Sequence, residues 1–129
     1  MTGAGGFVGA NLVRRLLHDG HEVAAAVRGG GQRWRLEGLG IRLAEVDVAD
    51  AEAVSALVGD VRPDRVFHLA AHGAYSWQTD RRAIYDTNLL GTANVLAASA
   101  DAEVGAIMLA GSSSEYGFKA EPMRETGWP

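Results

Sequence analysis

The chain has 129 residues, of which 47% are apolar and 22% charged, and its formal net charge is −4. This length and composition indicate one globular domain or part of one, and the negative charge argues against a nucleic-acid or membrane partner. The sequence contains no cysteine, which excludes a disulfide framework and a thiol nucleophile, and its four histidines lack the spacing of metal ligands.

The first nine residues, MTGAGGFVG, carry glycines at positions 3, 6 and 9 directly before an amphipathic pattern. Gly3 can make a tight turn, Gly6 leaves the backbone open to a pyrophosphate, and Gly9 lets a helix pack closely on a strand. A helix start also offers unpaired N–H groups to phosphates. The stretch therefore predicts a phosphate-binding loop. The alternative is a glycine-rich tail, because the strand that should precede such a loop is missing.

The next two elements are a helix and a strand. Val8, Leu12 and Leu16 recur at i, i+4 spacing and predict a helix, with Gly20 as its C-cap. His21–Val27 is a short apolar run after this helix stop, and we interpret it as a strand.

Further strands and helices alternate along the rest of the chain. Ile41–Val46 alternates apolar and polar residues, which predicts a strand. Asp50 is the expected N-cap of a helix over Ala51–Leu57. Val66–Ala71, VFHLAA, is a continuous apolar run typical of a strand buried on both faces, and His68 within it is expected to be a core histidine with its hydrogen bonds satisfied.

The last predicted elements are a helix over Arg81–Ala98, a buried strand over Ala106–Ala110 and a loop over Gly111–Gly117. Alternating strands and helices predict a doubly wound parallel α/β sheet. Ligands bind such sheets beyond the carboxyl ends of the strands, where Gly3–Gly9, Leu69–Ala71 and Ser112–Tyr116 are expected to converge.

Four motifs together resemble the extended short-chain dehydrogenase/reductases, and within them the nucleotide-sugar epimerases and dehydratases. They are TGAGGFVG, VFHLAA, TNLLGTANVL at Thr87–Leu96 and GSSSEYG at Gly111–Gly117. They occur in the family's order and span nearly all of the chain. The resemblance implies a Rossmann domain, bound NAD or NADP, and transient hydride transfer on a nucleotide sugar by a Ser/Thr–Tyr–Lys set. Separately, the sequence shows no secretory signal and no membrane span, so a cytoplasmic protein is the default expectation.

The resemblance also implies a set of cofactor-binding positions. They are the pyrophosphate loop, an acidic–apolar pair on the adenine, a strand end along the ribose and nicotinamide, and an asparagine that holds the loop and strand ends. In this chain the positions are Gly3, Gly6, Phe7, Val8, Gly9, Asp47, Val48, Leu69, Ala70, Ala71 and Asn88.

Cofactor choice depends on Arg28. It stands at the end of the second strand, where NAD-binding domains place an acid about 20 residues past the glycines. An arginine there can pair with a 2′-phosphate instead, so the sequence favours NADP over NAD. Alternatively, Arg28 is a solvated loop charge, and Arg33 or Arg35 is equally available for this role.

The GSSSEYG loop is expected to supply catalytic groups. By resemblance, one of Ser112, Ser113 and Ser114 is the catalytic hydroxyl, and we favour Ser113. Glu115 falls where dehydratases keep an acid, so it is either a base or only a cap of the loop. Tyr116 is not the catalytic tyrosine, which in the family belongs to a Tyr-x-x-x-Lys motif on a later helix.

No Tyr-x-x-x-Lys occurs in the sequence, whose single lysine is Lys119. We therefore expect an incomplete Rossmann domain, lacking its first strand and C-terminal part, and an internal fragment that is inactive alone. The parent protein would be an epimerase (an isomerase) or dehydratase (a lyase), and a homodimer through the helix around Arg81–Ala98. The alternatives are an NADP-dependent carbonyl reductase, which is an oxidoreductase, and a non-catalytic dinucleotide-binding module.

Overall fold

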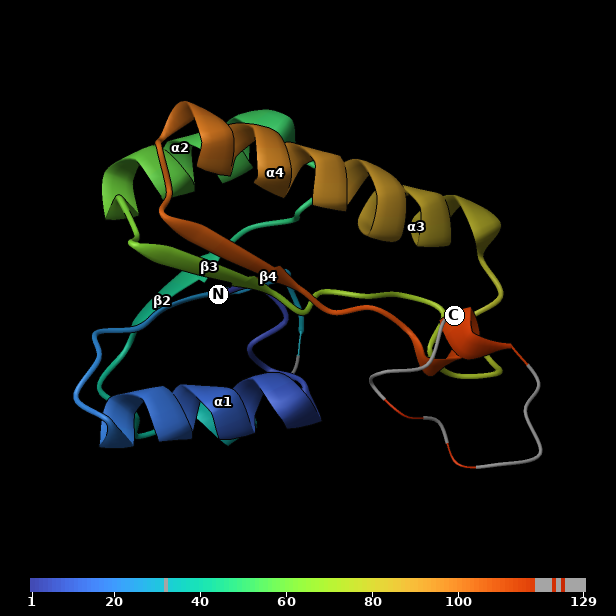
Figure 1. Ribbon diagram of the computed structural model, residues 1–129, viewed down its shortest axis with the longest axis horizontal. Helices are drawn as coiled ribbons and strands as arrows, with labels where there is room; N and C mark the ends of the chain where they lie inside the picture. Colours follow the sequence, from blue (N-terminus) through green and yellow to red (C-terminus); the bar gives the residue numbers. More distant parts are fainter. Residues whose placement is uncertain (32, 118–121, 123, 125–129) are drawn as a thin grey trace.

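The computed structural model describes residues 1–31, 33–117, 122 and 124. They form three layers, with a parallel sheet in the middle (Figure 1). Helix α1 (Phe7–His18) covers one face of the sheet, and helices α2 (Ala51–Val61) and α4 (Gly91–Asp101) cover the other. None of the helices in these ranges has the length and apolarity that a membrane crossing requires.

The sheet has two pairs of parallel strands joined by a short central segment. The strands are β1 (Ala24–Val27), β2 (Arg42–Glu45), β3 (Arg65–His68) and β4 (Ala106–Leu109). β1 pairs with β2 and β3 pairs with β4, all in parallel. Thr2 links the two pairs through parallel bridges to Ala26 and His68. The spatial order is therefore β2, β1, the Thr2 segment, β3 and β4, which is the predicted doubly wound Rossmann arrangement.

As expected, no strand precedes α1 in the described residues, and only two residues stand in the central position. Met1 and Thr2 keep the central position between β1 and β3. The Met1 amino group donates to Ala24 O at 2.8 Å, and Ala26 N donates to Met1 O at 2.8 Å. On the other side, Thr2 N donates to Phe67 O at 2.9 Å. These two residues form isolated bridges to both neighbouring strands and no strand of their own.

The helices around the sheet largely follow the predicted boundaries. α1 ends before Gly20, whose φ of +83° gives the expected reversal at the C-terminus. Asp50 caps α2 as predicted, with its Oδ1 accepting from Ala53 N at 3.0 Å. Val8, placed on the apolar stripe by its spacing, is instead 65% exposed. It lies in the first turn of α1, at the outer end of that stripe.

The predicted helix over Arg81–Ala98 is interrupted. It consists of α3 (Arg81–Tyr85), a π-helical segment η2 (Asp86–Leu90) and α4. Two 3₁₀ turns complete the described chain, η1 (Trp34–Leu36) and η3 (Ser113–Tyr116). π-Helical turns occur often at functional sites, so η2 is a candidate part of such a site.

The core lies on both faces of the sheet. Apolar side chains of α1 and β1 form one cluster, and those of α2, β3 and α4 form the other. Both clusters consist mainly of valine and alanine, small side chains that let the layers approach closely.

The prediction that Ala106–Ala110 is a buried strand is wrong for β4. Met108 is 52% and Leu109 44% exposed. β4 is the edge strand of the sheet in the described part of the chain. Its apolar side chains therefore have fewer neighbours than those of a central strand.

Candidate functional site

The turn after Thr2 lies directly against the end of β3. Gly3 has a φ of +66°, a conformation that favours glycine. A Cβ built on Gly3 would lie 2.5 Å from Leu69 O and 2.6 Å from Ala70 N. Because backbone atoms cannot give way as a side chain does, only glycine fits here. The structure therefore brings the opening turn and the Leu69–Ala71 stretch together, as the topology predicts.

Gly9 and Gly6 differ in what surrounds them. A Cβ on Gly9 would lie 2.8 Å from Ala4 Cα and closer still to Gly3 O, so α1 can reach the turn only without that atom. Gly6 N donates to Gly3 O at 3.1 Å and closes the turn. A Cβ on Gly6 would meet, among the described residues, only Gly3 O at 3.3 Å. Gly3 and Gly9 thus close the loop, and Gly6 leaves open space beside it.

The N-terminus of α1 presents bare backbone to that space. Its N-cap is Gly6, which offers no side-chain hydrogen bond to the first turn, and the first turn contains no acidic residue. Phe7 is 74% and Val8 65% exposed. The first N–H groups of a helix have no intrahelical partner and carry partial positive charge. These groups, with the open face of Gly6, fit the diphosphate of a dinucleotide.

Arg35 brings a positive charge to the same loop. Its Nη1 donates to Gly5 O at 3.4 Å, and its guanidinium lies 4.2 Å from the centroid of the Trp34 ring. Arg14 Nη2 in turn donates to Arg35 O at 2.5 Å, tying η1 to α1. Arg35 therefore places one positive charge beside the loop, which favours an anion there.

A chain of hydrogen bonds through the buried His68 links Thr2 to helix α4. Thr2 Oγ1 lies 2.7 Å from His68 Nδ1, and His68 Nε2 lies 3.0 Å from Thr92 Oγ1. The Thr92 hydroxyl donates to Asn88 O at 2.7 Å, so it accepts from His68 Nε2–H. The Thr2 hydroxyl then donates to Nδ1, and its oxygen accepts from Ala70 N at 3.3 Å. This arrangement satisfies a neutral histidine, as predicted for His68.

We expect His68 to make stability depend on pH. Burial lowers the pKa of His68 below its ordinary value, so the unfolded chain takes up this proton before the folded one. The contribution is fully present above about pH 6.5 and is lost as the pH falls below that value. Thermal melts at pH 7.5, 6.5 and 5.5 measure it. His68→Gln should remove this part of the pH dependence, and an unchanged dependence in that variant would contradict the assignment.

Asn88 fixes the backbone beyond β3. Its Oδ1 accepts from His72 N at 2.8 Å, and its Nδ2 donates to His72 O at 2.8 Å. Asn88 belongs to the π-helical segment η2. The two bonds hold the backbone where the chain leaves β3.

Asp47 and Val48 form a turn at the end of β2. Asp47 Oδ1 accepts from Ala49 N at 3.0 Å. Val48 is buried, and its carbonyl accepts from Asn94 Nδ2 at 2.9 Å. A Cβ on Gly91 would lie 2.5 Å from Val48 Cγ2, so this glycine lets α4 close on the turn. The turn is thereby held rigidly at the carboxyl edge of the sheet.

The three candidate arginines for a 2′-phosphate lie in different surroundings. Arg33 forms an ion pair with Glu45, the last residue of β2, and Arg35 lies at the glycine loop. Arg28 is exposed directly after β1 and makes no ion pair within the described ranges. It is thus the arginine with an unengaged charge at the strand end.

The GSSSEYG loop, Gly111–Gly117, follows β4. β4 lies two strand positions from the Thr2 segment, which is about 10 Å across the sheet. Ser112 caps η3, with its Oγ accepting from Ser114 N at 3.1 Å. Glu115 is exposed, and its Oε2 lies 3.2 Å from where a Cβ on Gly111 would be. Ser113 begins η3, but its side chain lies outside the described structure, as does Lys119.

Sequence reasoning missed two threonines in this site. Thr2 and Thr92 complete the hydrogen-bond chain on either side of His68. A signal existed for Thr92, because a threonine four residues after Asn88 in a helix can donate to its carbonyl. No local signal existed for Thr2, whose partner is 66 residues away.

The chain matches the NAD dependent epimerase/dehydratase family over residues 1–127. A protein named putative dihydroflavonol 4-reductase, from Synechocystis, is 39% identical over 125 residues, which are 96% of this chain and 35% of that protein. The crystal structure of UDP-glucose 4-epimerase from Thermus thermophilus in complex with NAD is 31% identical, with a TM-score of 0.86 over 99% of this chain and 42% of that one.

The Bordetella bronchiseptica enzyme WbmG, in complex with NAD and UDP, is 29% identical, with a TM-score of 0.84 over 98% of this chain and 41% of that one. The chain thus spans 35 to 42% of the length of these three proteins. The similarities confirm the Rossmann-type fold class. Since the family match extends over almost every residue, the chain belongs to the NAD-dependent epimerase/dehydratase family.

Proposed function

We propose that this chain is the dinucleotide-binding part of an enzyme that acts on a nucleotide sugar by transient hydride transfer through NAD or NADP. The observation that carries the proposal is the Gly3–Gly9 turn, which is closed by two glycines and left open at Gly6. Both crystal structures named above contain NAD, and one also contains UDP. These complexes support the same cofactor and substrate class for the protein to which this chain belongs.

The residues described here would bind and orient the cofactor. The N–H groups of Phe7 and Val8 would hold the pyrophosphate, and Asp47 and Val48 would flank the adenine. Leu69–Ala71 would lie along the ribose and nicotinamide. When bound, the nicotinamide supplies a site that accepts a hydride and returns it.

Proton transfer needs further residues. We assign to Ser113 the hydrogen bond to the reacting oxygen of the sugar, with Ser112 and Ser114 as its neighbours and Glu115 as the base of a dehydratase. A tyrosine with a nearby lysine would move the proton, and the sequence of this chain contains no Tyr-x-x-x-Lys. We therefore place that pair in other residues of the enzyme.

Arg28 gives a direct test of cofactor choice. If it pairs with a 2′-phosphate, Arg28→Ala should weaken NADP binding about tenfold, equivalent to about 1.4 kcal/mol, and leave NAD binding within about twofold. Fluorescence titration with both dinucleotides measures the two dissociation constants. Arg15→Ala is the matched control, since Arg15 is exposed on α1 and paired with Asp19. Equal losses for NAD and NADP in Arg28→Ala would contradict a role in phosphate recognition.

A second candidate function is an NADP-dependent carbonyl reductase. It is favoured by the 39% identity to the protein named as a reductase, against 31% to the Thermus epimerase. The enzyme encoded by the full reading frame should be incubated with UDP-sugars, and separately with NADPH and ketones. An epimerase converts the sugar with no net change at the reduced-nicotinamide band, whereas a reductase consumes that absorbance. Cofactor binding without either conversion would favour a non-catalytic module.

A further inference from the structure

Two aromatic side chains lie exposed in the loop between β3 and α3. The centroids of the Tyr75 and Trp77 rings are 4.5 Å apart, and the two ring planes are inclined by only 8°. Tyr75 is 58% and Trp77 73% exposed. Each ring therefore covers one face of the other, and most of the remaining ring surface is open to solvent. We call these two side chains the aromatic pair.

The loop that carries the aromatic pair is held by hydrogen bonds. Gln78 Oε1 accepts from Gly73 N at 3.1 Å and from Tyr75 N at 3.2 Å, and Gln78 N donates to Tyr75 O at 2.9 Å. The beginning of the loop is fixed by the two bonds between Asn88 and His72. A loop that is already ordered loses less conformational entropy when a ligand binds. The aromatic pair is thus preorganised.

The exposure of the aromatic pair is unusual for rings of this size. An aromatic side chain removes about 150 to 250 Å² from water when it is buried. Here the hydrogen bonds of the loop keep two such rings at the surface, stacked on each other and not packed into either core cluster. Ordered apolar surface that is left exposed is typical of binding sites.

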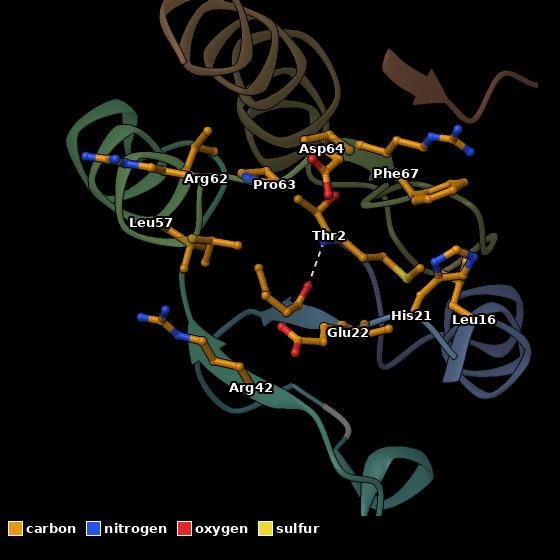
Figure 2. Close-up of a pocket in the computed structure, with 18 of the residues that line it drawn as sticks. Thr2, Leu16, His21, Glu22, Arg42, Leu57, Arg62, Pro63, Asp64 and Phe67 are labelled. Carbon is orange, nitrogen blue, oxygen red and sulfur yellow. Dashed lines mark hydrogen bonds between the residues drawn. The ribbon is translucent and has the colours of Figure 1, made fainter. Parts of the chain in front are cut away.

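A cavity of about 880 Å³ lies elsewhere in the structure. Residues at the amino ends of the strands line it, and they include Glu22, Arg42 and Asp64 (Figure 2). Neither ring of the aromatic pair lines this cavity. Ligands of a parallel sheet bind beyond the carboxyl ends of its strands, which is the opposite edge. The aromatic pair, which follows the carboxyl end of β3, lies at the edge where a substrate is expected.

The aromatic pair also follows directly after residues of the proposed site. Its loop begins at His72, next to the Leu69–Ala71 stretch that we place along the nicotinamide. β3 and β4 are paired to their last residues, and Ala110 N donates to His68 O at 3.0 Å just beyond. The chain segments after β3 and β4 therefore leave the same edge of the sheet about 5 Å apart (Figure 1). The segment after β4 is the GSSSEYG loop, to which we assign the reacting oxygen.

The composition of the loop suits a sugar ring better than a phosphate. The stretch from His72 to Thr79 contains no lysine, arginine, aspartate or glutamate, so it lacks the cations that usually bind a diphosphate. It contains two aromatic rings and the hydroxyls of Tyr75, Ser76 and Thr79. A pyranose ring has C–H groups on its faces, which pack against the negative face of an aromatic ring, and hydroxyls around its rim.

We propose that the aromatic pair binds the sugar ring of the nucleotide sugar by stacking. Trp77, the more exposed of the two, contacts the sugar, and Tyr75 is a positioning residue that holds the Trp77 ring. The occupant is the sugar and not the nucleotide, because the reacting carbon of the sugar must reach the nicotinamide. This inference rests on the proposed function, which assigns the neighbouring stretches to cofactor and substrate.

The test is Trp77→Ala in the enzyme encoded by the full reading frame. Titration calorimetry measures the dissociation constants of UDP-glucose, UDP-galactose, UDP and NAD. The UDP-sugar that the unmodified enzyme binds more tightly should bind about tenfold more weakly to Trp77→Ala, because the ring face is lost. UDP and NAD should change by less than about twofold. The melting temperature should stay the same, because Trp77 is exposed.

Further variants separate stacking from apolar contact and from folding. Trp77→Leu should lose as much affinity as Trp77→Ala, whereas Trp77→Tyr keeps an aromatic face and should stay within about threefold of the unmodified enzyme. Tyr75→Ala should weaken the UDP-sugar about threefold, and Tyr75→Phe should restore it. Tyr85→Ala is the matched control, since Tyr85 is 56% exposed on α3. It should bind all four compounds as the unmodified enzyme does.

The outcomes distinguish this inference from the proposed function. If the unmodified enzyme binds a UDP-sugar and Trp77→Ala binds it equally well, the stacking site is wrong and the proposed function stands. If UDP is weakened as much as the UDP-sugar, the rings bind the nucleotide, and the stacking site for the sugar is also wrong. If the unmodified enzyme binds neither UDP-sugar, the proposed function is wrong and this inference with it.

Discussion

Gly9→Ala is expected to destabilise the fold by about 3 kcal/mol, an effect at the upper end of those seen for overpacked sites. The added Cβ would lie 2.8 Å from Ala4 Cα and closer still to Gly3 O. Both are backbone atoms of the turn that leads from the central segment into α1, so relief requires α1 to move off the sheet. A thermal melt should show Tm lowered by about 10 °C.

Two glycines serve as controls for Gly9→Ala. A Cβ on Gly6 has one contact at 3.3 Å among the described atoms, so Gly6→Ala should change stability by less than about 1 kcal/mol. Gly59 lies within α2, and a Cβ there meets nothing described within 4 Å. Gly59→Ala should therefore stabilise the chain by about 0.5 to 1 kcal/mol, because alanine favours helix. A melt in which Gly9→Ala equals Gly59→Ala would contradict the close approach of α1 to the turn.

His68→Ala is expected to lower the free energy of unfolding by about 3 kcal/mol. The substitution removes a buried ring, so the Thr2 hydroxyl loses its acceptor and the Thr92 hydroxyl loses its donor. Loss of buried volume and unpaired polar groups both contribute to a value of this size. Urea denaturation measures the change. The expected result is a lower midpoint with an unchanged slope, which is the signature of a loss of stability alone.

His18→Ala is the matched control for His68→Ala. His18 is exposed in the last turn of α1, so its loss should change stability by no more than about 0.5 kcal/mol. If His68→Ala is as mild as His18→Ala, the hydrogen-bond chain does not hold the glycine turn to helix α4. The variant His68→Gln can keep one of the two hydrogen bonds. Its loss of stability should therefore lie between those of His68→Ala and His18→Ala.

The elements that the sequence predicts correctly are those with a local cause. α1 follows from its apolar spacing and its terminal glycine, and α2 begins where Asp50 can accept from Ala53 N. The turn at Gly3 follows from glycine spacing, because each glycine in the pattern has a separate steric reason. The order of strands could be predicted from their alternation with helices, since crossovers in such sheets have one hand.

Other features have causes that lie far apart in the sequence. The amino-acid composition of the π-helical segment Asp86–Leu90 does not distinguish it from an α-helix. The two differ only in which carbonyl each N–H group reaches. The pairing of Thr2 with His68 spans 66 residues. The exposure of Met108 depends on what lies beside β4, which an apolar run does not encode.

The central claim is that the bare backbone at the start of α1 holds a dinucleotide diphosphate. Titration calorimetry with NAD and with NADP, on the unmodified chain and on Gly6→Val, tests it most directly. We predict saturable one-to-one binding of at least one dinucleotide to the unmodified chain, weakened at least 100-fold in Gly6→Val while its melting temperature is retained. Absence of binding by either dinucleotide to the folded chain, or equal affinity in Gly6→Val, would contradict the claim.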